Sequence, residues 1–116
     1  MDPITRHHYK NIAEGKSVQN KDGSLSTVKT FTVERDGVVY LMPSIFDGVD
    51  FSNNLEEAEK RALQQNVFKT FTGKTPAEAE KKAQAFDKKI HENMKPISAT
   101  DAQFILKYGE KSSDIF

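Results

Sequence analysis

Two apolar runs in the first half of the chain alternate in the manner of a β-hairpin. The first covers 25–34 and contains three threonines, two valines and one phenylalanine, and the second covers 38–43 with the sequence VVYLMP. Both compositions favour strands. Asp36-Gly37 lies between the runs and can supply the two positive φ angles of a type I′ turn. That turn predicts three cross-strand pairs: Val33 with Tyr40, Phe31 with Met42, and Thr32 with Leu41.

This register gives the hairpin two apolar faces. We therefore expect it to be covered twice, once by a helix and once by another layer, which is either part of this chain or a partner protein. Pro43 has no N–H for a ladder and should end the second strand or lie at its edge. Asp47-Gly48 predicts another turn, which leads into a short strand over 49–51.

The longest helix is predicted over 76–93. Thr75-Pro76-Ala77-Glu78 forms a capping box with proline at the first helical position, which is the most specific local signal in the chain. Apolar residues then recur at steps of three or four, as one face of a helix requires: Ala79, Ala83, Phe86, Ile90 and Met94. The small alanines allow this helix to approach a sheet closely.

Two shorter helices flank the long one. Asn54 can cap a helix over 55–65 whose first turn is acidic, and whose inner side is expected to hold Leu55, Ala58, Ala62 and Leu63. A second capping box over 100–103 predicts a helix over 101–108. Gly109 should terminate it.

These elements predict an α+β fold, a small antiparallel sheet built on the hairpin and packed against the long helix. The single domain is expected to cover 25–109. The segment 1–24 is polar and shows no sustained period, so we interpret it as an N-terminal arm that can fold onto a neighbour. The polar segment 110–116 is interpreted as a C-terminal tail.

Composition and charge narrow the classes of partner. The chain has 116 residues, with Lys plus Arg and Asp plus Glu at 17 each and a net charge of zero. Neither a nucleic-acid binder nor a polybasic membrane-surface module is typically so balanced. The absence of cysteine removes disulfides and thiolate sites and favours synthesis in a reducing cytoplasm. No run approaches the roughly 20 apolar residues of a membrane span, and we expect no signal peptide.

Each candidate for chemistry has a simpler interpretation. His7-His8 could bind a metal, but adjacent side chains rarely face one ion. His91 lies off the inner side of its helix and is expected to be solvated. Glu78 and Glu80 are better explained by capping and solvation than by acid–base work. We therefore expect no catalytic residue, no cofactor and no metal site.

Apolar residues near the C-terminal end are the candidates for a partner interface. Ile115-Phe116 is an apolar end that could enter a pocket of a neighbouring protein. Phe104, Ile105 and Tyr108 are expected to extend that surface.

The order of motifs in the middle of the chain resembles a small domain of tailed-bacteriophage virion-associated proteins. The motifs that carry the resemblance span about 19–94 and are, in order, Asp22-Gly23-Ser24, Ser26-Thr27-Val28, Asp36-Gly37, Tyr40-Leu41-Met42-Pro43, Asp47-Gly48, Glu56-Glu57-Ala58, Phe68-Lys69-Thr70-Phe71 and Thr75-Pro76-Ala77-Glu78-Ala79. Asp87 stands near the place of a histidine usual in that family, and the segment after Pro96 has no counterpart there. The resemblance implies a structural or ejection-related virion component without catalytic residues.

Three functions are therefore weighed. The first is a non-catalytic virion protein, an internal, ejection-type or head–tail component that assembles with other virion proteins or with itself. The second is a small phage-encoded inhibitor or adaptor that binds a host protein. The third is an accessory subunit of a cell-wall lytic enzyme.

Overall fold

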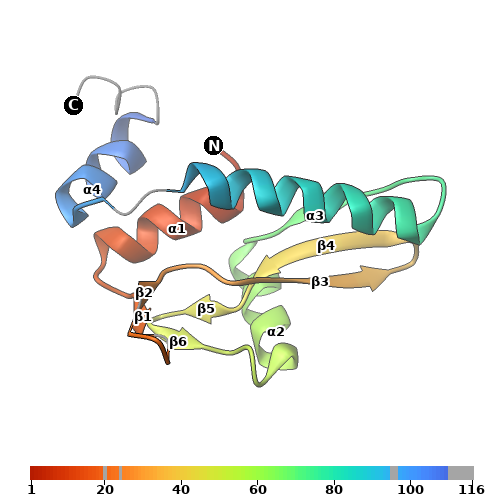
Figure 1. Ribbon diagram of the computed structural model, residues 1–116, viewed down its shortest axis with the longest axis horizontal. Helices are drawn as coiled ribbons and strands as arrows, with labels where there is room; N and C mark the ends of the chain where they lie inside the picture. The colour runs from red at the N-terminus through yellow and green to blue at the C-terminus, as the bar shows by residue number, and fades with distance from the viewer. Residues whose placement is uncertain (20, 24, 95–96, 110–116) are drawn as a thin grey trace.

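The structure is a computed structural model that describes residues 1–19, 21–23, 25–94 and 97–109 (Figure 1). It has an α+β fold, as predicted. The helices are α1 (Pro3–Ala13), α2 (Leu55–Gln65), α3 (Pro76–Asn93) and α4 (Ala99–Tyr108). The strands are β1 (Val18–Gln19), β2 (Leu25–Ser26), β3 (Thr30–Arg35), β4 (Val38–Pro43), β5 (Ile45–Phe46), β6 (Val49–Asp50) and β7 (Lys69–Phe71).

The predicted hairpin forms the centre of the main sheet, which has the antiparallel order β3-β4-β7. All three predicted cross-strand pairs are confirmed. The reason is the turn: Asp36 and Gly37 have φ angles of 54° and 80°, the geometry of a type I′ turn. Strand β4 ends at Pro43, where the ladder no longer needs an N–H.

The other strands agree with the prediction only in part. The run 25–34 is divided, because β2 pairs with β1 in a separate small sheet while β3 begins at Thr30. The strand expected over 49–51 forms as β6, which pairs with β5 in a small sheet of its own. The third strand of the main sheet is β7, whose three residues are too few to show a period.

Helix α3 covers one face of the main sheet (Figure 1). Its bounds and its Thr75 cap are those predicted, and Thr75 Oγ1 accepts a hydrogen bond from Glu78 N at 3.2 Å. Ala79 and Ala83 are buried against Val39. The alanine side of α3 thus brings the helix backbone close to the sheet.

Helix α2 packs on the opposite face, so both layers over the hairpin belong to this chain. Its bounds and its Asn54 cap match the prediction, and Ala62 contacts the cluster of Met42 and Phe46. The predicted inner side was wrong at Leu55 and Leu63, which are each 45% exposed. Only the small residues fit against the large side chains of the sheet.

The interpretation of 1–24 as an arm was wrong, because α1 is part of the core. Asp2 caps α1 by accepting hydrogen bonds from Ile4 N and Thr5 N. Ile4 is fully buried with Val28, Leu41 and Ile90. The side of α1 that faces the protein is otherwise mostly polar: Thr5, His7, His8 and Asn11 are buried. Because these buried residues are polar, the sequence shows no apolar period here and the helix is not predicted from hydropathy.

Helix α4 packs against α1, on the side of the molecule away from the β3–β4 turn (Figure 1). It begins at Ala99, earlier than predicted, because Ser98 rather than Thr100 is its cap and accepts a hydrogen bond from Asp101 N at 3.1 Å. Gly109 ends it at a φ of 92°, as predicted. The predicted tail, 110–116, lies outside the described residues.

Candidate functional site

The outward side of α4 carries an aromatic pair. Phe104 and Tyr108 are one helical turn apart, with ring centroids 4.6 Å from each other. Tyr108 is 56% exposed, and the ammonium group of Lys107 lies 5.2 Å from its ring centroid. A shallow hollow of about 300 Å³ adjoins the pair, and polar residues complete its rim: Thr100, Asp101, Gln103 and Lys107.

The predicted partner interface is only partly consistent with this arrangement. Phe104 and Tyr108 lie at the surface of α4, but Ile105 is 4% exposed and packs in the cluster that joins α4 to α1. Ile105 therefore belongs to the core, because it follows Ala102 on the inner side of the helix. Ile115 and Phe116 lie outside the described residues.

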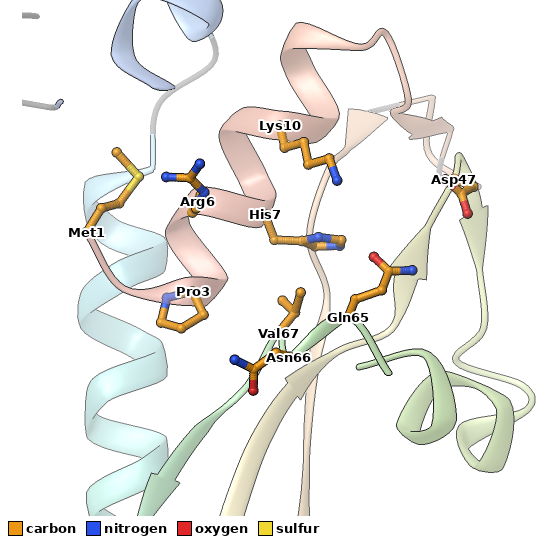
Figure 2. A pocket seen from close by; sticks show the side chains of 9 residues that line it. All are labelled: Met1, Pro3, Arg6, His7, Lys10, Asp47, Gln65, Asn66 and Val67. Carbon is orange, nitrogen blue, oxygen red and sulfur yellow. The ribbon is translucent and has the colours of Figure 1, made fainter. Parts of the chain in front are cut away.

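A second hollow lies between α1 and the segment that follows α2 (Figure 2). This cleft has a volume of about 690 Å³ and is lined by Met1, Pro3, Arg6, His7, Lys10, Asp47, Gln65, Asn66 and Val67. Arg6, His7 and Lys10 follow one another along α1; the side chains of His7 and Lys10 extend toward the side of Gln65, and the guanidinium group of Arg6 lies on the side of Met1 (Figure 2). Sequence reasoning missed this cleft, because it interpreted 1–24 as an arm.

His7 links α1 to the core beside the cleft. Its Nε2 lies 2.6 Å from the carbonyl oxygen of Ile45, and because a carbonyl only accepts, Nε2 carries the proton. The ring also lies 4.8 Å from that of Phe46. Burial lowers the pKa of His7, against the opposing effect of the Ile45 carbonyl. His7 is thus a neutral donor at the inner end of the cleft.

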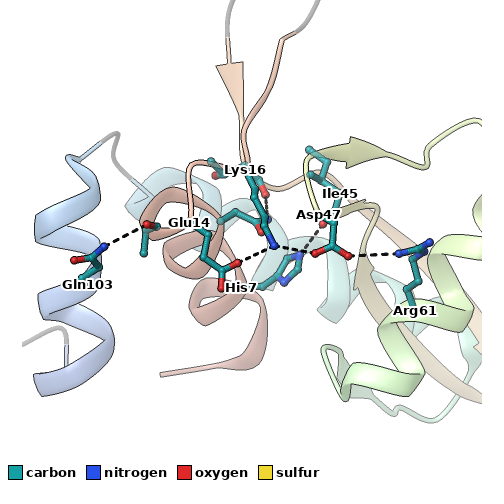
Figure 3. A network of polar contacts seen from close by, with 10 residues as sticks. His7, Glu14, Lys16, Ile45, Asp47, Arg61 and Gln103 are labelled. Atoms are coloured by element: carbon teal, nitrogen blue, oxygen red, sulfur yellow. Dashed lines mark hydrogen bonds and ion pairs between the residues drawn. The ribbon is translucent and has the colours of Figure 1, made fainter.

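Asp47 is the carboxylate of the cleft, and it is occupied by two cations (Figure 3). Lys16 Nζ lies 3.0 Å from Asp47 Oδ1 and 3.2 Å from Glu14, and Arg61 lies 3.6 Å from Asp47 Oδ2. The hydrogen bond from Lys16 lowers the pKa of Asp47. The network connects the β5–β6 turn to the end of α1 and to α2, and Asp47 shares its two cations with Glu14 and with Glu57, which lies 3.0 Å from Arg61 Nε.

The other polar residues of α1 serve the fold. His8 Nδ1 forms a hydrogen bond with Thr27 Oγ1, and Asn11 Nδ2 donates to the Thr27 carbonyl at 2.7 Å. Together with His7 they replace the apolar residues that a buried helix usually presents. The signal that could have revealed α1 was the combination of an Asp2 cap with Pro3 at the first helical position, which favours a helix start.

The remaining candidates for chemistry have structural contacts. Glu78 Oε2 accepts a hydrogen bond from Lys74 N at 3.3 Å, and Glu80 Oε1 accepts from Thr32 Oγ1 at 2.8 Å. His91 Nδ1 lies 3.0 Å from Asp87 Oδ1 at the surface. Within 1–19, 21–23, 25–94 and 97–109, no three His, Cys, Asp or Glu residues are placed to hold a metal ion. None of the described helices is both long and apolar enough to cross a bilayer.

The buried, neutral state of His7 predicts a pH-dependent stability. Its pKa is lowered in the folded chain, so below about pH 6.5 the unfolded chain binds a proton that the folded chain resists. The contribution is complete above that pH and is lost as the pH falls through it. In urea unfolding at pH 7.5 and 5, we expect His7→Gln to lose less stability on acidification than the unaltered protein. His91→Gln is the same change at an exposed histidine and should lose as much stability on acidification as the unaltered protein. An equal loss of stability in His7→Gln and the unaltered protein would contradict the assignment of His7 as a buried, neutral side chain.

Comparison of the chain with protein-family models, with curated proteins and with solved structures finds no match.

Proposed function

We propose that this chain is a non-catalytic structural protein of a tailed-bacteriophage virion, an internal, ejection-type or head–tail component. It is synthesised in the bacterial cytoplasm and acts in the particle by assembling with other virion proteins or with copies of itself. Two observations support this proposal. The order of turn and capping motifs over 19–94 supports a virion protein, and the surface of α4 supports assembly with another protein.

The observation that carries the proposal is the aromatic pair on α4. Phe104 and Tyr108 stack at 4.6 Å beside a hollow of about 300 Å³, on a helix that lies at one end of the molecule (Figure 1). Aromatic side chains next to a pocket and surrounded by a polar rim are the usual centre of a protein interface. Assembly through this face requires no change in the core, because Ile105 holds α4 on α1 from the other side.

The balanced charge supports assembly over binding to nucleic acid. A standard interface takes about 800 Å² from each partner, and a few aromatic anchors supply most of its energy. The polar rim of the α4 surface contains one acid and one base, Asp101 and Lys107. Such a rim is compatible with a protein partner. A surface that binds the phosphate backbone of a nucleic acid usually carries an excess of positive charge.

Tyr108→Ser is expected to weaken assembly about tenfold or more, because an aromatic anchor at an interface contributes about 2 kcal/mol. Self-assembly is measured by sedimentation of the purified chain at concentrations from about 1 to about 500 µM, a range that includes the dissociation constants of weak dimers. Assembly with other virion proteins is measured by co-sedimentation with purified particles. Leu63→Ser is the matched control, because Leu63 is 45% exposed on another helix, α2, which lies away from α4 (Figure 1). Equal assembly by Tyr108→Ser and the unaltered chain would rule out the α4 surface.

Mass spectrometry of purified particles tests the function itself. A virion protein is present after extensive washing of the particles, in an amount that scales with a known capsid or tail protein. A host-directed inhibitor is found instead in the soluble lysate and is absent from the particles. Absence from the particles would contradict the proposed function, whatever the behaviour of Tyr108→Ser.

A further inference from the structure

The cleft on α1 is separate from the aromatic surface on α4. The two hollows share no lining residue. The volume of the cleft, about 690 Å³, lies within the range of about 300–1,000 Å³ that is usual for small-molecule sites. The cleft is therefore large enough to enclose an organic ligand.

The charges of the cleft are unbalanced in favour of cations. In the described part of the chain, Arg6 and Lys10 form no ion pair, whereas Lys16 and Arg61 are paired with Asp47. Asp47, the carboxylate of the lining, shares these two cations with Glu14 and Glu57. His7 adds no positive charge, because burial lowers its pKa. Among the residues that line the cleft, the two cations Arg6 and Lys10 outnumber the single carboxylate.

The spacing of the two cations suits a compact dianion. Arg6 and Lys10 are four residues apart on α1, which places their Cβ atoms about 5–6 Å apart on the same side of the helix. A phosphomonoester carries about 1.5–2 negative charges at pH 7 and three acceptor oxygens. The positive end of α1 is already satisfied by the carboxylate of Asp2, so the attraction comes from the side chains and not from the helix terminus.

The rest of the lining provides an apolar wall and two amides. Pro3, Val67 and the neutral ring of His7 border the same cleft. In Figure 2 the amide of Gln65 extends toward the space beside His7 and Lys10. Asn66 holds its place as the left-handed cap of α2, with a φ of 58°. The lining thus combines one charged end with an apolar side, the arrangement that orients an amphipathic ligand.

We propose that the cleft between α1 and the segment after α2 binds a small phosphomonoester with a planar apolar body, its phosphate between Arg6 and Lys10 and its body against Pro3, Val67 and the His7 ring. The contribution of each charged contact weakens with salt, since both side chains are exposed and charges at the surface are screened. This site is independent of the proposed role in assembly.

The test is a titration of the uniformly ¹⁵N-labelled full chain with phenyl phosphate, followed by amide chemical shifts. We expect saturable shifts in the backbone amides of residues 4–10 and in the side-chain amides of Gln65 and Asn66. Inorganic phosphate and phenol, each of which keeps one half of the probe, should bind at least about tenfold more weakly. Equal affinity for inorganic phosphate and phenyl phosphate, or shifts spread over all surface lysines, would overturn the proposal.

Two charge-matched double variants complete the experiment. Arg6→Gln/Lys10→Gln should weaken binding of phenyl phosphate by about a hundredfold, since each lost charged contact costs about tenfold. Lys81→Gln/Lys89→Gln removes two exposed cations from α3 and should leave the affinity unchanged. Both variants alter exposed side chains, and their amide spectra report whether the fold is retained. Equal affinity of the two variants would overturn the proposal.

Discussion

Ile4→Ala is expected to lower the free energy of unfolding by about 2–5 kcal/mol. Ile4 is 0% exposed and packs against Val28, Leu41 and Ile90. The substitution leaves a cavity where α1, the main sheet and α3 meet. Because a domain of this size is stabilised by only about 5–15 kcal/mol in total, this single change removes a large share of that stability.

Urea unfolding followed by far-UV circular dichroism measures the effect of Ile4→Ala. Ile4→Val, which removes one methyl group, should cost about 0.5–1.5 kcal/mol at the same position. Leu25→Ala, at a residue that is 67% exposed, should stay within about 0.5 kcal/mol. An Ile4→Ala loss no greater than that of Leu25→Ala would mean that α1 does not pack in the core in solution.

Phe46→Ala is expected to cost about 3–5 kcal/mol. Phe46 is 1% exposed and lies in the cluster that joins Met42 on the sheet to Ala62 on α2. Its ring also lies 4.8 Å from that of His7. Because α2 presents only small residues here, it has no long side chain that can move into the space left by the ring.

Phe104→Ala is the matched control, the same truncation at a half-buried position on α4. We expect it to cost about 1.5 kcal/mol or less, chiefly its contact with Tyr108. Thermal unfolding of the two variants under one buffer condition gives the comparison. Equal losses from Phe46→Ala and Phe104→Ala would contradict the assignment of Phe46 to the core.

The parts of the fold that could be predicted are those fixed by local interactions. Asp36-Gly37 determines the register of the hairpin because its backbone geometry is set within the turn. Thr75 and Asn54 mark the starts of α3 and α2 because a cap is satisfied within one helical turn. In these places the relevant partners are adjacent in the sequence.

The parts that could not be predicted depend on contacts between distant segments. Helix α1 was missed because His7 and Asn11 satisfy their polar groups against Ile45 and Thr27, which are far along the chain. The cleft was missed with it, since one of its walls is α1. The rotation of α2, which exposes Leu55, follows from the bulk of the side chains already on the sheet.

The position of α1 has a consequence for how the chain matures on the ribosome. Ile4 packs on Ile90 and Tyr9 packs on Ala102 and Ile105, so the segment translated early is completed by segments translated late. A nascent chain that ends before α4 leaves Tyr9 and Ile12 of α1 without the residues they pack against. Closing so long a loop costs little more free energy than closing one of half the length. The loop can close only after the later segment has been synthesised. Native packing of α1 therefore waits until α3 and α4 have left the ribosome, and the interval before it is when chaperones have most to protect.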